Sequence, residues 1–353
     1  MRIVVDIGPM DSNSTSGHKV RGVGKYIKLL RDNLQKFDET NTYIFSSNPS
    51  KERGIDLIHY PYFDPFFITL PLIKRTKSLV TVHDVIPLSH AKQFPVGIKG
   101  NIKWKLNKAI LKQVNGIITD SFASKDQIHK ITGISEKKIY PVHLAVDHEF
   151  KRLEKGAWEN KIRKKYSLPE VFVLYVGDVT WNKNLPNIVV SAKKTNIPLV
   201  IVGKALSELN FDVKNPWNSD RKIVLDQTLN NPLFIKLGFV PTDELVEIYN
   251  LAQALLMPSF DEGFGLPVLE AMKSGCPVIT SDRGSLAEVA GDAAIYVDPD
   301  DPESISKAIG QILVSKSLKN ELVDKGFEQA KHFSIEKMMK DTITVYNTFS
   351  HEK

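Results

Sequence analysis

The residues best placed to carry out chemistry lie in one short stretch of the second half of the chain. Residues 255–280 read LLMPSFDEGFGLPVLEAMKSGCPVIT, and two glutamates in it, Glu262 and Glu270, are eight positions apart. A turn with Gly263 and Gly265 separates an apolar run from a segment of helical character. Glycines let a backbone approach a ligand closely, and the free N–H groups at a helix N-terminus favour negative charge. The stretch therefore predicts an anion site bracketed by carboxylates, which accept hydrogen bonds from sugar or ribose hydroxyl groups.

His83 is a further candidate, because it follows the apolar run Leu79–Val82 and lies four positions before Pro87. Histidine changes its charge near neutral pH and therefore suits catalysis. Structural interpretations stand beside these functional ones. A histidine at a strand end is often a satisfied polar group, Glu262 would also serve a helix dipole, and Glu270 would also be a solvated helix residue.

The sequence disfavours a dinucleotide site, a Walker A phosphate site and a metal site. Gly22 and Gly24 begin a G-x-G pattern, but Ile27 stands where a dinucleotide fingerprint needs its third glycine. The chain has no Walker A lysine motif and no His-rich metal cluster. Its one cysteine, Cys276, rules out an intramolecular disulfide and is expected to be a small buried residue rather than a nucleophile.

Taken together, these motifs resemble the retaining glycosyltransferases of family 4, which are nucleotide-sugar enzymes of the GT-B fold. The two glutamates are similar to the E-x7-E signature of that group. TVHDVIP at 81–87 looks like the His-Asp-x-x-Pro segment of its mannosyltransferase-like members. The resemblance runs the length of the chain, and its other segments are RGVGKY (21–26), TDSFASKDQI (119–128), LAVD (144–147), YVGDVTWNKN (175–184), LGFVPTDEL (237–245) and GSLAEVAGDAA (284–294).

The resemblance implies a role for each matching residue. His83 and Glu262 would be the catalytic residues: Glu262 would contact the donor sugar, and His83 would lie beside its C6 region and support the transition state. Glu270 would bind the ribose hydroxyls, and Lys183 would sit on the diphosphate. The other implied donor-binding residues are the base-flanking Phe239 and Val240, the backbone N–H donors Phe264, Gly265 and Leu266, and Gly22 and Gly24, whose backbone would meet the phosphates or the acceptor.

One position departs from the pattern of the family. Many members carry an arginine immediately before the lysine, whereas this chain has Asn182 before Lys183. One of two expected phosphate cations is therefore missing at this point. Either another basic residue replaces it, or the site binds diphosphate less tightly.

The elements that must position these residues alternate between strands and helices. Helical stretches such as Lys25–Gln35, Asp243–Ala252 and Ser304–Val314 lie between apolar runs, which predicts parallel sheets with helices on both faces. The expected strands of the first half are Ile3–Ile7, Tyr43–Ser46, Leu57–Tyr60, Leu79–His83, Gly116–Thr119 and Ile139–His143. Those of the second half are Phe172–Val176, Leu199–Val202, Ile235–Phe239, Ala254–Met257, Val278–Thr280 and Ala294–Val297.

The chain length of 353 residues is too great for one core and suggests two domains. We expect an α/β protein with two doubly wound, Rossmann-like domains facing across a cleft, as in the GT-B fold. The first domain spans residues 1–165, on the acceptor side, and the second spans 166–334 and binds the nucleotide sugar. Residues 335–353 would form a helix, capped by Ser334, that packs across the domain junction.

Composition excludes several classes of protein. With 42% hydrophobic and 25% charged residues, the chain is neither disordered nor a coiled coil. No apolar run is long enough for a membrane span, and the start does not read as a secretory signal peptide. We therefore expect a cytoplasmic protein. The net charge is +13 over residues 1–165 and −7 over 166–353, so the first half alone is basic. Such a half often faces anionic ligands or membranes, although a solubility bias explains it equally well.

The functional hypothesis is a retaining glycosyltransferase. It would move a hexose, with mannose as the first candidate, from a nucleoside-diphosphate sugar to a saccharide or lipid-linked acceptor in cell-surface polysaccharide or glycolipid synthesis. No metal or other cofactor is expected, because Lys183 and the helix N-terminus would meet the charge on the leaving group. No nucleic-acid partner is expected either. The alternatives are a nucleotide-sugar epimerase and a non-catalytic sugar-nucleotide-binding protein of the same fold.

The stretch Ile98–Val114 suggests a further partner. At about 100° per residue, one face holds Ile98, Ile102, Leu106, Ala109 and Ile110, which would pack on the sheet of the first domain. Another face holds Lys105, Lys108 and Lys112, flanked by Trp104 and Leu111. This second face would suit an anionic membrane and would place the protein peripherally on its inner leaflet. An ordinary solvated face with a buried Trp104 is the alternative.

Overall fold

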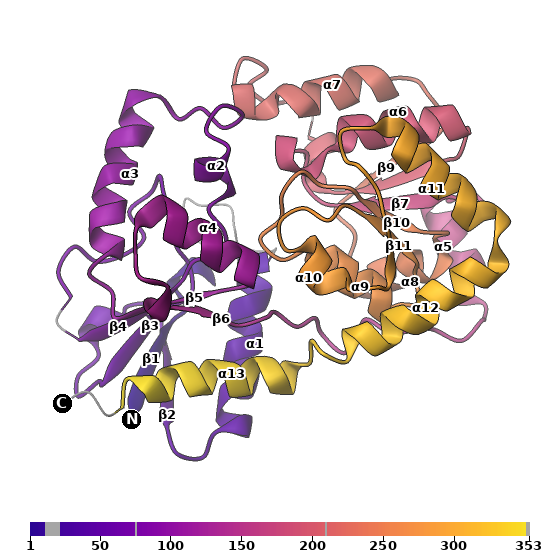
Figure 1. Ribbon diagram of the computed structural model, residues 1–353. Helices are drawn as coiled ribbons and strands as arrows, with labels where there is room; N and C mark the ends of the chain where they lie inside the picture. Colours follow the sequence, from indigo (N-terminus) through magenta and orange to yellow (C-terminus); the bar gives the residue numbers. More distant parts are fainter. Residues whose placement is uncertain (11–21, 75, 209, 351–353) are drawn as a thin grey trace. The chain divides into compact units, whose positions relative to one another are not determined.

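The structure is a computed structural model that describes residues 1–10, 22–74, 76–208 and 210–350 (Figure 1). Contacts within it divide the chain into two compact units, and each is described by itself. Unit 1 comprises Met1–Ala91, Val96–Ala145 and Phe333–Lys353, and unit 2 comprises Lys92–Pro95 and Val146–His332.

Unit 1 is built on a parallel sheet of six strands in the order β2-β1-β3-β4-β5-β6. Its strands read as nearly continuous apolar runs because helices cover both faces of the sheet. Val4, Ile58 and Val80 point to one face and pack with Ile110 and Ile128 of the covering helices. The strands are β1 (Arg2–Asp6), β2 (Thr42–Ser46), β3 (Leu57–Tyr60), β4 (Lys77–Thr81), β5 (Gly116–Thr119) and β6 (Ile139–Pro141).

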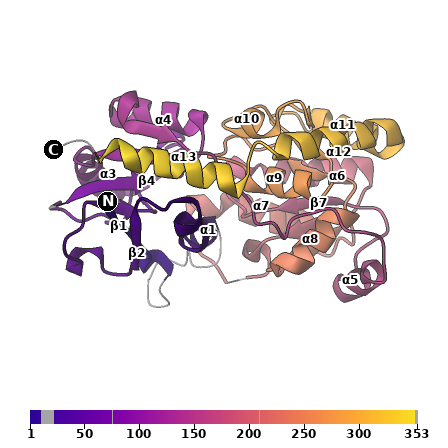
Figure 2. The same cartoon turned by 90° about the horizontal axis from the view of Figure 1, so that it is seen from below.

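The helices of unit 1 come from both ends of the chain. One face of the sheet carries α3 (Gly97–Leu111) and α4 (Phe122–Thr132), and a short helix, α2 (Ile86–Ser89), follows β4. On the other face, α1 (Gly22–Phe37) packs beside the C-terminal helix α13 (Ile335–Thr348), as Figures 1 and 2 show. The expected cap of α13 is confirmed, since Ser334 Oγ accepts a hydrogen bond from the N–H of Lys337 at 3.1 Å.

Unit 2 holds a second parallel sheet of six strands, in the order β12-β11-β10-β7-β8-β9. One buried cluster joins the sheet to α6 and α11 on one face, and α8 and α9 pack on the other (Figure 1). The strands are β7 (Val173–Val176), β8 (Leu199–Val202), β9 (Phe234–Gly238), β10 (Leu255–Met257), β11 (Val278–Thr280) and β12 (Ala294–Tyr296). The helices are α5 (Trp158–Tyr166), α6 (Leu185–Thr195), α7 (Ser219–Thr228), α8 (Thr242–Leu251), α9 (Leu266–Lys273), α10 (Leu286–Ala290), α11 (Pro302–Val314) and α12 (Lys316–Ala330).

All twelve expected strands are present, and the prediction of two doubly wound domains is confirmed. The division of the chain differs from the expected one in three places, of which Lys92–Pro95 in unit 2 is described with the site below. The boundary falls at residue 146 rather than 166, because α5 packs on α8 of unit 2 and Lys165 pairs with Glu244 there. The segment from Phe333 onward belongs to unit 1, where α13 packs on α1.

Candidate functional site

The turn between β10 and α9 is shaped by one glycine in a left-handed conformation. Gly265 has φ of +96°, and a Cβ there would lie 2.9 Å from the side chain of Leu286, so glycine is required. Helix α9 begins at the next residue, Leu266, as expected. In its first turn Pro267 has no N–H, and the N–H of Val268 donates to the carbonyl oxygen of Gly265 at 2.9 Å. Phe264 is 4% exposed and lies in the same turn. The predicted glycine turn and helix N-terminus are therefore present, whereas the anion site itself stays a prediction.

A second glycine lets another loop hold this turn closely. Gly284 follows β11 with φ of +58°, and a Cβ there would lie 2.7 Å from the backbone N and O of Glu262. The next residue, Ser285, donates from both its N–H (3.1 Å) and its Oγ (3.0 Å) to the carbonyl oxygen of Glu262. The backbone of Glu262 is thus fixed from the neighbouring strand.

Lys183 and Glu262 form an ion pair at the centre of the site. Lys183 Nζ lies 2.7 Å from both carboxylate oxygens of Glu262. Ser259 Oγ donates to Glu262 Oε1 at 2.8 Å, so the carboxylate is held from two sides. Glu262 is almost fully buried, whereas the side chain of Lys183 is 23% exposed. The structure therefore brings two of the predicted donor-site residues together in direct contact.

The two residues before Lys183 clamp the same turn. Asn182 donates from Nδ2 to the carbonyl oxygen of Asp261 (3.1 Å), and its own carbonyl oxygen accepts from the N–H of Phe260 (2.8 Å). The ring of Trp181 stacks on Phe260 with centroids 4.9 Å apart. Asn182 is 6% exposed, so the residue that replaces the usual arginine is a buried structural anchor for the turn.

A segment of the first half of the sequence also packs beside this clamp within unit 2. The ring of Phe94 meets Trp181 edge-on at 6.2 Å and Trp217 at 5.0 Å. Trp217 Nε1 donates to the carbonyl oxygen of Pro95 at 3.0 Å. These contacts explain why Lys92–Pro95 belongs to unit 2, which no signal in the sequence predicted.

Glu270 lies in the middle of α9 and is 6% exposed. Tyr249 of α8 donates its hydroxyl to Glu270 Oε2 at 3.0 Å, which orients the carboxylate. Burial, together with the neighbouring carboxylate, raises the pKa of Tyr249 well above its usual range, so it remains a donor. Sequence reasoning did not identify Tyr249, because a tyrosine on an amphipathic helix looks like a core residue.

The loop after β9 carries the two residues that were expected to flank a base. Phe239 is 53% exposed, whereas Val240 is buried. The ammonium group of Lys204 lies 5.4 Å from the centroid of the Phe239 ring. Lys204 follows the end of β8 by two positions, and sequence reasoning overlooked it among many lysines.

The positions of these residues share one feature of the fold. Each lies just beyond the carboxyl end of a strand or on the helix that follows, and the carboxyl ends of parallel strands meet at one edge of a sheet. The residues are Lys183 after β7, Lys204 after β8, Phe239 and Val240 after β9, and Glu262, Phe264, Gly265, Leu266 and Glu270 after β10. This edge of unit 2 is where a doubly wound sheet binds its ligand.

In unit 1, His83 also lies beyond the carboxyl end of a strand, two residues after β4. Its Nδ1 lies 2.9 Å from Asp120 Oδ2, and its Nε2 lies 3.3 Å from the carbonyl oxygen of Pro61. Burial by itself would lower the pKa of His83, but the carboxylates of Asp120 and Asp84 outweigh it and raise the pKa. His83 is therefore held in one orientation by a carboxylate that sequence reasoning did not identify.

A buried chain of hydrogen bonds lies beside His83. Tyr26 of α1 meets the His83 ring edge-on at 5.1 Å, and its hydroxyl lies 3.0 Å from Thr81 Oγ1. Thr81 Oγ1 lies 2.8 Å from His59 Nε2, and His59 Nδ1 lies 2.7 Å from the hydroxyl of Tyr346 in α13. Burial lowers the pKa of His59 to about 3, with a further contribution from the charge of His83. These hydrogen bonds link the C-terminal helix α13 to the surroundings of His83.

The glycine pair of the first half forms the first turn of a helix instead of a loop. Gly22 begins α1 and is exposed, with no atom within 4 Å of where its Cβ would be, and Gly24 is buried two residues later. Arg21, which begins RGVGKY, lies outside the described residues.

The expected orientation of α3 is wrong. Ile98, Ile102 and Leu106 are 80%, 63% and 43% exposed instead of facing the sheet. The buried side carries Asn107, Ile110 and Leu111, with Trp104 partly buried beside them, because the loop before β4 packs there. Asn107 Nδ2 donates to the carbonyl oxygens of Asp64, Pro65 and Phe67 in that loop. Trp104 and Leu111 are thus not membrane-facing, and Lys108 donates to the carbonyl oxygen of Ile131.

The described residues hold neither a cluster of metal ligands nor a helix suited to span a membrane. No group of three or more His, Cys, Asp or Glu side chains among them is arranged to hold a metal ion. Within the same residues, no helix combines the length and apolar character needed to cross a bilayer. Cys276 is buried, and burial raises the pKa of its thiol to about 12.

Two family models match the chain, one in each half. Residues 20–150 match Glycosyltransferase Family 4, and residues 158–329 match Glycosyl transferases group 1. The chain is 29% identical to the O-antigen chain mannosyltransferase B of Escherichia coli, over 82% of this chain and 75% of that one. It is 30% identical to the O-antigen chain mannosyltransferase RfbU of Salmonella typhimurium, over 69% and 62% of the two chains. The match to the Escherichia coli mannosyltransferase WbdA, at 27% identity, spans only 32% of that longer protein.

Solved structures share the fold. The sucrose-phosphate synthase of Thermosynechococcus elongatus superposes with a TM-score of 0.73, covering 98% of each chain at 19% identity. Anabaena HepE, solved with UDP and glucose, gives 0.72 at 13% identity, over 99% of this chain and 100% of its own. The predicted GT-B fold class is therefore confirmed, whereas the expected cleft between its domains stays a prediction.

Proposed function

Since this chain is a glycosyltransferase with a family 4 domain followed by a group 1 domain, we propose that it transfers mannose from a nucleoside-diphosphate sugar. The acceptor is a saccharide or a lipid-linked saccharide, and the product belongs to a cell-surface polysaccharide or glycolipid. The O-antigen mannosyltransferases among its relatives support the choice of sugar. The observation that carries the proposal is the Lys183–Glu262 pair at the N-terminal end of α9.

In this proposal unit 2 binds the donor. The N–H groups at the start of α9 and the ammonium group of Lys183 receive the diphosphate, where they stabilise the charge that grows as it leaves. Glu262 contacts the donor sugar, and Glu270 accepts hydrogen bonds from the ribose hydroxyls. Phe239 flanks the base, and because Asn182 is a buried anchor, Lys204 is the candidate for the second phosphate cation.

The proposed reaction retains the configuration at the anomeric carbon. The bond between that carbon and the phosphate oxygen breaks, and the bond to the acceptor oxygen forms on the same face. The proton of the acceptor hydroxyl passes to the leaving phosphate. No metal ion or other cofactor takes part, since Lys183 and the helix N-terminus meet the negative charge.

Unit 1 supplies His83 and binds the acceptor. Asp120 fixes the His83 ring, so that it supports the transition state without a cost of reorientation. Gly22 at the start of α1 leaves backbone space for the acceptor or a phosphate.

We further propose that unit 1 docks on the cytoplasmic face of an anionic membrane. The surface responsible, here called the α3 surface, consists of the exposed apolar residues Ile98, Ile102 and Leu106 of α3 together with Phe67. Lys103 lies over the Phe67 ring at 5.0 Å, and Lys99 and Lys105 are exposed on the same helix. Apolar side chains rimmed by lysines are typical of proteins that bind at the interface of anionic lipids.

The test is turnover of a panel of nucleotide sugars, preceded by thermal-shift screening for the donor that raises the unfolding midpoint. We expect a mannose nucleotide to bind and to be consumed only when a mannose-containing acceptor is present, and we expect NMR of the product to show an α-linkage. Conversion of the sugar without acceptor, or an inverted linkage, would contradict the proposal.

A further inference from the structure

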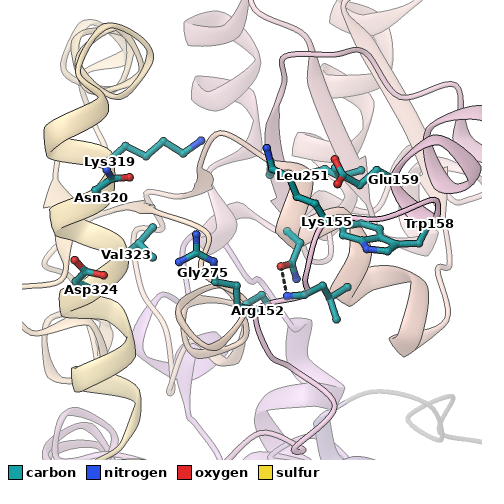
Figure 3. Close-up of a pocket in the computed structure, with 14 residues that line it drawn as sticks. Arg152, Lys155, Trp158, Glu159, Leu251, Gly275, Lys319, Asn320, Val323 and Asp324 are labelled. Atoms are coloured by element: carbon teal, nitrogen blue, oxygen red, sulfur yellow. Dashed lines mark hydrogen bonds between the residues drawn. The ribbon is translucent and has the colours of Figure 1, made fainter.

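Unit 2 contains a cavity of about 470 Å³ whose lining includes none of the predicted site residues (Figure 3). In Figure 3, the segment before α5 contributes Arg152 and Lys155 and the start of α5 contributes Trp158, whereas α12 contributes Lys319, Asn320 and Asp324 on the other side. Its volume lies within the range that small-molecule sites occupy. The lining residues are Arg152, Leu153, Lys155, Trp158, Glu159, Asn250, Leu251, Ala252, Ser274, Gly275, Lys319, Asn320, Val323 and Asp324.

The cavity lies at the opposite edge of the sheet from the donor residues. Leu251 and Ala252 lead into the start of β10, and Ser274 and Gly275 lead into the start of β11. Helix α9 runs between the two edges, with Leu266 at the donor edge and Lys273 at the other. Its eight residues span about 12 Å, at 1.5 Å per residue. A ligand here would therefore be separate from the nucleotide sugar.

One buried polar group of the lining has no partner. Ser274 is 1% exposed, and among the described residues its Oγ makes no hydrogen bond. The Ser274 oxygen is itself buried, so it lies in the wall of the cavity and does not reach a ligand. Asn250 beside it is satisfied by the N–H of Leu153 and by two carbonyl oxygens. Contacts with a ligand therefore come from the charged and aromatic residues of the lining.

The charges of the lining exclude a simple ion as the ligand. Three cations, Arg152, Lys155 and Lys319, share the cavity with the carboxylates of Glu159 and Asp324. An anion would also meet the C-terminal ends of α8 and α9, whose carbonyl groups disfavour negative charge. A cation would be repelled by the three basic side chains. A neutral ligand with many hydroxyl groups satisfies both signs, since each hydroxyl donates and accepts.

Trp158 gives the cavity an apolar surface as well. Its indole N–H donates to the carbonyl oxygen of Glu154 at 2.8 Å, which fixes the ring and leaves no polar group of the indole in need of a partner. A flat apolar ring among donors and acceptors suits a sugar ring, whose C–H groups pack on the indole while its hydroxyls bond to the charged residues.

We infer that this cavity binds a saccharide, separately from the donor and from the acceptor site of unit 1. The identity of the sugar as mannose rests on the proposed function. An enzyme that extends a saccharide gains from a second site, because holding one part of the chain raises the effective concentration of the rest.

Calorimetry with a linear α-linked mannotriose tests the inference on the full chain. Wild-type protein should bind it at two sites, the acceptor site and the cavity. Trp158→Ala should weaken the cavity component about tenfold, and Asn320→Ala, at an exposed polar residue of the lining, about three- to tenfold. Lys164→Ala, in the exposed part of α5 outside the lining, is the matched control and should bind as wild type does.

Turnover of the donor with a monosaccharide acceptor should stay within twofold of wild type in every variant. Unchanged mannotriose binding in both cavity variants, or a single site in wild type, overturns the inference and leaves the proposed function standing. Titration with inorganic phosphate is the second arm, and phosphate binding that Arg152→Ala abolishes would overturn the assignment of a neutral ligand. Absence of donor turnover in wild type would instead refute the proposed function, while the calorimetry would still report on the cavity.

Discussion

Lys183 and Glu262 hold each other in place before any donor arrives, with the ammonium group 2.7 Å from both carboxylate oxygens. The proposed phosphate cation is therefore bonded to the carboxylate that is proposed to contact the sugar. Glu262 is 6% exposed, so its charge depends on this cation and on Ser259 for compensation. Binding of the donor must share or replace that interaction.

Lys183→Ala should lower kcat about 10²- to 10³-fold, because one donor to the leaving diphosphate is lost. It should also lower the free energy of unfolding by about 1–3 kcal/mol, since Glu262 is left buried without its cation. Steady-state kinetics and denaturant unfolding measure the two effects. Lys194→Ala is the control, because Lys194 pairs with Glu303 on the surface and both side chains are about half exposed.

The enzyme should remain active in EDTA, because protein groups alone are proposed to stabilise the charge of the diphosphate. Loss of activity that Mg²⁺ or Mn²⁺ restores would show that Lys183 is not the principal cation.

Glu270→Ala should weaken nucleotide binding by about 1.5–3 kcal/mol, or roughly ten- to a hundredfold in Kd. The reason is the loss of charged hydrogen bonds to the ribose. Tyr249→Phe removes only the hydroxyl that orients the carboxylate, and its effect should be smaller. Calorimetry with the nucleoside diphosphate measures both, and equal affinity of Glu270→Ala and wild type would exclude the ribose role.

His83→Ala should lower kcat much more than it changes the Kd of the donor, since the proposed role is in the transition state. Asp120→Asn should have a milder effect on kcat and should move the part of the pH–rate profile due to His83 to lower pH, because the carboxylate raises the pKa of His83. An Asp120→Asn profile that coincides with that of wild type would show that Asp120 does not act through His83.

His59 should make the protein less stable in acid. Its pKa is about 3 in the folded state, against 6.5 when it is exposed, so the unfolded chain binds more protons between these values. The free energy of unfolding should therefore fall below pH 6.5, by about 1.4 kcal/mol per pH unit from this group. Denaturant unfolding between pH 7 and pH 5 measures the slope. His59→Gln should flatten it, whereas His148→Gln, at an exposed side chain, should leave it unchanged.

The sequence predicted the strands well because parallel strands covered on both faces are short, continuous apolar runs, such as Leu57–Tyr60 and Leu199–Val202. The turn at Gly265 was also predictable, since a glycine directly before a helix has few structural alternatives. Long-range packing was not predictable from the sequence. The orientation of α3 depends on the loop that Asn107 anchors, and its apolar residues occur on more than one face.

Partners of the site residues were equally hidden. His59 lies within the strand run LIHY and looks like an ordinary core residue until Tyr346, 287 positions away, is placed against it. The role of Asn182 depends on a carbonyl oxygen 79 positions away in the sequence. Pairings of this kind are properties of the folded chain.

The last prediction concerns the α3 surface. Ile98 and Ile102 are 80% and 63% exposed, so replacing both with serine removes apolar contact with a membrane at little cost to folding. The double variant should bind anionic vesicles at least about tenfold more weakly than wild type. Val314→Ser, at a site 86% exposed in unit 2, is the matched control and should bind as wild type does.

Cosedimentation with phosphatidylserine-containing and purely neutral vesicles measures this binding at low and high salt. Each lysine near the surface contributes about 1 kcal/mol of attraction to anionic lipid, so wild-type binding should fall as salt screens the charge. A triple charge reversal at Lys99, Lys103 and Lys105 should remove the salt dependence without changing the apolar residues. Equal pelleting of the serine variant and wild type, or no binding of wild type to anionic vesicles at low salt, would mean that the α3 surface does not dock on lipid and that the acceptor is reached in solution.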